Sequence, residues 1–150
     1  MQKQESSWSS GWRSSLAWMV IVVVVFTVIQ GIRGGGHSLT AEVDDTRIGI
    51  VCDRNEPQFF LLSDLSDVQL VSDIGGLTSS GGTQDQHFAF GSFVSDTFGE
   101  VTVMAWTEHR AFIVLKLRDQ TIIFNCANDR DTENKYKDIL QAKEATVHGE

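Results

Sequence analysis

The sequence predicts a mainly β domain behind an N-terminal transmembrane helix. The domain is expected to be an antiparallel barrel or sandwich of about seven short strands, capped by one C-terminal helix. Three observations lead to this prediction. An unbroken apolar run begins at Leu16. Short segments rich in β-branched and aromatic residues, separated by turns, fill residues 47–126. A sparse apolar stripe at helical spacing follows within residues 128–145.

The apolar run predicts a membrane anchor over residues 16–33. It has no polar side chain from Leu16 to Phe26, which is too long for a buried strand and lacks the polar face of a soluble helix. As a helix, residues 16–32 span about 25 Å, slightly short of the ~30 Å of a hydrocarbon core. Trp12 and Trp18 suit the membrane interface on the near side. We therefore expect this segment to contact the lipid bilayer.

A cleaved signal peptide is the competing interpretation of the same run. It follows a charged leader, and Gly34–Gly36 offer small residues at a cleavage site. Arg33 lies between the run and that site, however, and no A-x-A sequence is present. Basic residues before the run and acidic residues after it favour a single-pass cell-membrane protein whose C-terminal domain is extracytoplasmic.

Composition divides the chain into five parts. They are a polar tail (1–15), the anchor (16–33), a glycine linker (34–37), a β domain (38–145) that ends in a helix at about 129–143, and a short tail (146–150). The net charge is −8, and residues 1–33 carry +2, so the remainder carries −10. Phosphate backbones repel such a domain, and we therefore expect no nucleic-acid partner.

The domain is expected to contain seven strands and one long loop. The strands are predicted at 47–53, 58–62, 67–74, 87–94, 100–106, 111–117 and 121–126. Residues 118–120 are predicted to join the last two strands as a hairpin, and the glycine-rich stretch 74–86 is predicted to be a loop. Asn128, Asp129 and Asp131 suit the capped, acidic first turn of the final helix.

Three stretches resemble the bacterial PH-like (pleckstrin-homology-like) domains. They are FFLLSDLSDVQLV (59–71), FGSFVSDTFGEVTVMAW (90–106) and FIVLKLRDQTIIFNCANDRDTENKYKDIL (112–140). The resemblance implies a seven-strand barrel closed by a helix, and a membrane-associated binding or assembly module without shared catalytic residues. Lipid-binding PH domains carry basic residues between their first two strands. Here residues 53–57 offer one cation against two anions.

The reactive side chains show no catalytic or metal-binding spacing. Cys52 and Cys126 are far apart and form no C-x-x-C pair, so they are expected to be small buried side chains or, outside the cell, one disulfide. The four histidines are scattered, and no phosphate-binding loop or nucleophile elbow occurs. We therefore expect no cofactor and no enzymatic activity.

A glycine-rich loop and a set of aromatics remain as candidate binding residues. The aromatics are expected to pack in the core, or else to form an apolar partner-binding patch with the glycines. The residues are Gly75, Gly76, Gly81, Gly82, Phe88, Phe90, Phe93 and Phe98. The predicted function is a membrane-tethered, non-enzymatic interaction or assembly module. It would bind protein partners or a second copy through an exposed sheet edge or the loops at 75–99. A lipid-sensing domain and a secreted or surface enzyme are the alternatives.

Overall fold

A computed structural model describes residues 38–53 and 55–148 of the chain. The predicted N-terminal tail, anchor and glycine linker lie outside the described residues, as do residues 149–150 of the C-terminal tail. All described residues belong to one compact unit, 37–150. Within this part of the chain, no helix combines the length and the apolar character needed to cross a membrane.

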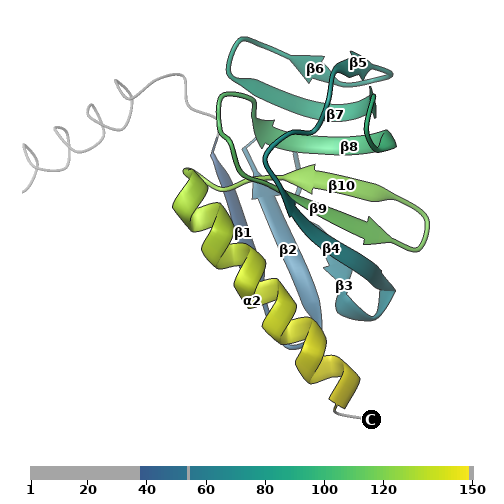
Figure 1. Cartoon of the computed structure of the whole chain (residues 1–150), viewed down its shortest axis with the longest axis vertical. Coiled ribbons are helices and arrows are strands. Elements are labelled where there is room, and N and C mark those ends of the chain that lie inside the picture. The colour runs from purple at the N-terminus through teal and green to yellow at the C-terminus, as the bar shows by residue number, and fades with distance from the viewer. Residues whose placement is uncertain (1–37, 54, 149–150) are drawn as a thin grey trace, which may run out of the picture. The chain divides into compact units, whose positions relative to one another are not determined.

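The first three strands form a small antiparallel sheet, here called sheet A (Figure 1). They are β1 (Leu39–Val43), β2 (Arg47–Cys52) and β3 (Gln58–Leu61), in that order across the sheet. Side chains alternate between its two faces. The inner face carries Ile48 and Ile50, which are 0% and 1% exposed.

The other seven strands form sheet B, in the order β4-β9-β10-β8-β7-β5, with β6 beside β7. They are β4 (Leu65–Val71), β5 (Leu77–Ser79), β6 (Thr83–Gln84), β7 (Phe88–Ser95), β8 (Gly99–Trp106), β9 (Phe112–Leu117) and β10 (Thr121–Phe124). The predicted hairpin between β9 and β10 is present. β10 runs parallel to β8, which corrects the expectation of a purely antiparallel domain. β9 and β10 form a hairpin after β8, and the strand of this hairpin that pairs with β8 is the second one, β10. This strand runs in the same direction as β8.

Helix α2 (Asp129–His148) follows the last strand and extends past the predicted end. Asn128 caps it as expected, because its Oδ1 accepts a 2.8 Å hydrogen bond from the Asp131 N–H. Asp129 and Asp131 place negative charge in the first turn, where the helix dipole favours it. One 3₁₀ turn, η1 (Leu62–Asp64), links β3 to β4.

Sheet B is buried on both faces. Ile113 and Leu115 of β9 belong to a first core shared with sheet A and with Ile139 of α2. Phe112 and Val114 of the same strand point the other way, into a second core. Residues 72–76 connect β4 at one edge of sheet B to β5 at the other. Ile74 of this segment packs into the second core.

The predicted class, mainly β with one C-terminal helix, is confirmed. The described residues contain ten strands rather than about seven, in two sheets. Neither sheet closes into a barrel among these residues, since the pairing of sheet A ends at β1 and β3 and that of sheet B at β4 and β5. The additional strands are β1, β5 and β6, all five residues or shorter.

Candidate functional site

The predicted aromatic set lies mainly inside the domain. Phe88 and Phe93 are each 1% exposed. Phe88 lies in the first core, against which Phe90 packs, whereas Phe93 lies in the second core with Phe98 against it. These side chains lie on both faces of sheet B and do not form one surface patch. Core packing, the first of the two expectations for them, describes their position.

The glycines of the predicted loop lie close to the end of β7 and to the turn that follows it. A Cβ added to Gly82 would lie 2.4 Å from the Phe93 ring, and one added to Gly76 would lie 2.5 Å from the Asp96 carboxylate. Gly75 adopts a φ of +73°, which favours glycine. The segment borders a hollow of about 350 Å³, whose lining includes Gly75, Gly76, Leu77 and His109.

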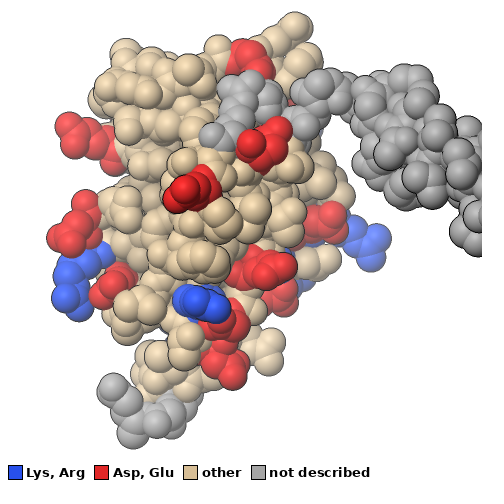
Figure 2. Space-filling model, turned by 180° about the vertical axis from the view of Figure 1, so that it is seen from behind, with Lys and Arg blue, Asp and Glu red and all other residues tan. Residues whose placement is uncertain are grey.

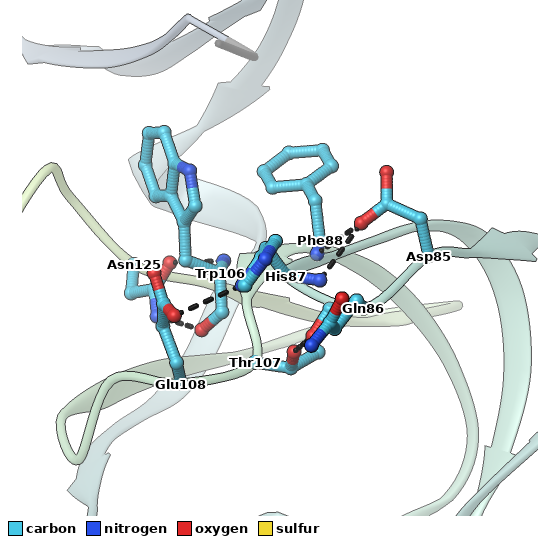
Figure 3. A network of polar contacts seen from close by, with 8 residues as sticks. All are labelled: Asp85, Gln86, His87, Phe88, Trp106, Thr107, Glu108 and Asn125. Atoms are coloured by element: carbon cyan, nitrogen blue, oxygen red, sulfur yellow. Dashed lines mark hydrogen bonds and ion pairs between the residues drawn. The ribbon is translucent and has the colours of Figure 1, made fainter. Parts of the chain in front are cut away.

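A polar network joins the start of β7 to the end of β8 (Figure 3). Asp85 Oδ1 accepts hydrogen bonds from the backbone N–H groups of His87 and Phe88, each 2.8 Å long. His87 Nδ1 lies 3.0 Å from Glu108 Oε2 on the surface. Asn125 is 0% exposed and bonds both the N–H and the C=O of Trp106 at 2.9 Å. Its amide therefore continues the β10–β8 pairing by one step, which is a structural role.

The two cysteines are thiols and are not joined by a disulfide. Cys52 lies in the first core, whereas Cys126 lies between β10 and α2, where its N–H donates to Thr132 Oγ1 at 2.9 Å. Burial raises the pKa of the Cys126 thiol. Among residues 38–53 and 55–148, no group of three or more His, Cys, Asp or Glu side chains is placed to hold a metal ion.

The outer face of sheet A carries an apolar cluster, here called the β3 patch: Val51, Phe59 and Leu61. Their exposed fractions are 41%, 59% and 53%. The strand register places all three on one face. Phe59 lies opposite Gly49, and Leu61 lies opposite Arg47. Gly49 and Arg47 precede Val51 in β2 by two and four residues, and residues at even spacing share one face of a strand. Isolated exposed apolar side chains are ordinary in proteins, but three neighbours on one sheet face form a candidate contact surface.

Gly49 and Arg47 hold the Phe59 ring in place. A Cβ at Gly49 would lie 3.0 Å from Cε1 of Phe59, so the ring covers the glycine in the middle of β2. The Arg47 guanidinium lies 4.9 Å from the ring centroid. Asp44 fixes Arg47 through a 2.9 Å contact to its Nε. Hydrogen bonds from the Thr46 backbone and the Arg47 side chain lower the pKa of Asp44 to about 2.

β3 is an edge strand, and its outward backbone groups belong to Phe59 and Leu61. In an antiparallel pair, every second residue bonds to the neighbouring strand. The Leu62 N–H donates to the Thr46 carbonyl at 2.9 Å, so in the same register Phe60 and Gln58 bond to β2. Phe59 and Leu61 therefore direct their N–H and C=O groups away from sheet A.

Charged groups lie at both ends of this edge. A groove of about 290 Å³ runs beside it and is lined by Phe59, Phe60, Leu61, Asp64, Leu117, Arg118, Asp119 and Gln120. Arg118 Nη2 lies 3.5 Å from Asp64 Oδ1 with three quarters of its side chain exposed. Glu56 is exposed before the other end of β3. Figure 2 shows the side of the molecule turned away from the viewer in Figure 1, where carboxylates and fewer basic side chains are spread with uncharged surface between them.

Sequence reasoning predicted the β3 strand but did not single out the β3 patch. The signal was present in QFFLL (58–62), where consecutive apolar residues point to both faces of a strand. Such a run predicts either a strand buried on both sides or an exposed apolar face. Only the sheet order, which leaves β3 at an edge, distinguishes the two.

Comparison of the chain with protein-family models, with curated proteins and with solved structures finds no match.

Proposed function

We propose that the chain is a membrane-tethered, non-enzymatic interaction or assembly module that binds a protein partner or a second copy of itself. The observation that carries this proposal is the β3 patch, an exposed apolar cluster beside an unpaired sheet edge. An edge strand offers backbone hydrogen bonds to a further strand, and its side chains add specificity.

The surroundings of two other edges, those of β4 and β1, support this choice. Lys143 of α2 donates from Nζ to the Ser66 carbonyl of β4, the first edge strand of sheet B, at 2.9 Å. Thr146 of the same helix lies 3.4 Å from the Asp45 carbonyl, just after β1. Helix α2 therefore contacts one edge region of each sheet, as Figure 1 also shows for β1. No described segment pairs with β3 on its outer side.

The proposal places this domain in the PH-like class, held at the cell membrane by residues 16–33 with its C-terminal part extracytoplasmic. Two features support this placement: sheets A and B share the first core, and the C-terminal helix packs against that core through Ile139. A domain with a net charge of −10 gains from a contact that depends on backbone and apolar groups, because such a contact needs no basic partner surface.

The test is site-specific photo-crosslinking of the full chain in its native membrane. A photoreactive residue is placed at Val51 or, as control, at Val94, because both side chains are 41% exposed. We expect protein adducts from position 51 and not from position 94, and their loss when Phe59→Ser and Leu61→Ser are combined. Equal adducts from the two positions, or adducts with lipid alone, would contradict the proposal.

A further inference from the structure

We infer that the occupant of the β3 edge is a second copy of this chain, bound by antiparallel pairing of β3 with β3 around a two-fold axis at Phe60. The inference rests on the proposed function and names the partner. A two-fold axis perpendicular to a sheet keeps the outer faces of both copies on the same side. Only registers that place same-face residues opposite each other are then allowed.

The register centred on Phe60 satisfies the free backbone groups. It places Phe59 of one copy opposite Leu61 of the other, twice by symmetry. These are the two residues whose N–H and C=O groups point outward from β3. Each Leu61 N–H then donates to the Phe59 carbonyl of the other copy. Each Phe59 N–H donates in return to the carbonyl of Leu61, the residue that precedes the η1 turn.

The same register joins the exposed side chains. Phe59 and Leu61, which are 59% and 53% exposed in one copy, become cross-strand pairs on the outer face. Aromatic and aliphatic side chains directly opposite each other stabilise antiparallel sheets. Val51 extends this apolar surface on the next strand of each copy. Phe60, half-buried beside the groove, meets its own symmetry mate on the other face.

In this arrangement one cation, Arg118, lies between carboxylates of the two copies at each strand end. The chain before β3 of one copy passes the end of β3 in the other, which brings Glu56 toward Asp64 and Arg118. Arg118 lies 3.5 Å from Asp64 with most of its side chain exposed, so it can also reach Glu56 of the other copy. A shift of two residues along β3 would remove this pairing and, by symmetry, would separate both Phe59–Leu61 pairs.

Cysteine crosslinking of the full chain in membranes tests both contact and register. Two tagged forms, Phe59→Cys and Leu61→Cys, are co-expressed in a background with Cys52→Ala and Cys126→Ala. In the proposed register, positions 59 and 61 face each other as a bonded pair with Cα atoms about 5.5 Å apart, within disulfide range. Two copies of position 59 lie on a diagonal of about 7–8 Å. We expect the mixed 59–61 disulfide to exceed both the 59–59 product and a Val94→Cys control at least about fivefold.

A second measurement avoids the cysteine background. Energy transfer between two fluorescently tagged full chains should fall in the Arg118→Glu variant and recover when Glu56→Lys is added.

A mixed disulfide no stronger than the Val94→Cys control overturns the inference, and so does one no stronger than the 59–59 product. If photo-crosslinking from Val51 still captures another protein, the proposed function stands and only the self-pairing fails. If it captures none, both fail.

Discussion

Replacement of Asn125 by alanine is the most direct test of how sheet B is held together. The Asn125 side chain is 0% exposed and bonds the N–H and the C=O of Trp106, each at 2.9 Å (Figure 3). Asn125→Ala leaves both backbone groups of Trp106 without these partners. A buried polar group that loses its partner costs about 1–3 kcal/mol, so two such groups predict a loss of about 2–6 kcal/mol in the free energy of unfolding.

The assay is chemical denaturation of the full chain in mild detergent, followed by near-ultraviolet circular dichroism. Asn55→Ala is the matched control, because Asn55 is an exposed asparagine in the turn after β2. A loss in Asn125→Ala below about 1 kcal/mol, or equal to that of the control, would refute the reasoning.

Asn125→Asp separates the two bonds. It keeps an acceptor for the Trp106 N–H but loses the donor to the Trp106 carbonyl. Burial should raise the pKa of the new carboxyl above its unfolded value of about 3.9. The ionised form is therefore penalised in the folded state, and stability should increase as the pH falls from 7 toward that value. A pH-independent deficit in this variant would contradict the buried position of the side chain.

Three further predictions concern the helix, the turn before β2 and the thiols. Ile139→Ala, at a side chain with 0% exposure, should lower the free energy of unfolding by about 2–5 kcal/mol, whereas Val147→Ala, at 68% exposure, should not. NMR titration should show the Asp44 carboxyl with a pKa of about 2, and Arg47→Leu should raise that pKa. Because the pKa is lowered in the folded chain, the stabilising contribution of Asp44 is present above about pH 4 and is lost as the pH falls toward 2. Burial raises the pKa of the Cys126 thiol, so maleimide should label this cysteine at least about tenfold more slowly in the folded chain than in denaturant.

The strands that the sequence predicts well are those with long apolar runs. The prediction at 111–117 matches β9 (Phe112–Leu117), because FIVL fills both cores and reads as a continuous run. The hairpin to β10 is local and follows from its short polar turn. The parallel pairing of β10 with β8 is not local, and no spacing in the sequence encodes which strand completes the sheet.

The short strands escape prediction for a different reason. β5 and β6 lie in the predicted loop 74–86, and their residues are exposed apart from the half-buried Leu77. They are strands because their backbones pair with β7, with Thr78 opposite Val94 and Thr83 opposite Phe90. Hydrophobic alternation reports side-chain burial, so it does not detect a strand that contributes mainly backbone hydrogen bonds.

The small size of the β3 patch and the predicted anchor are consistent with each other. Three apolar side chains and a four-residue strand fall well short of the roughly 1,600 Å² buried in a stable protein interface, so two free domains should associate weakly. The proposed anchor at residues 16–33 would confine both copies to one plane, with only the segment 34–38 between anchor and β1. Confinement raises the effective concentration of one copy around another, and a weak edge contact then suffices to pair the tethered copies. For this reason, the contact should be measured in membranes, since a monomer in dilute solution is compatible with pairing of tethered copies.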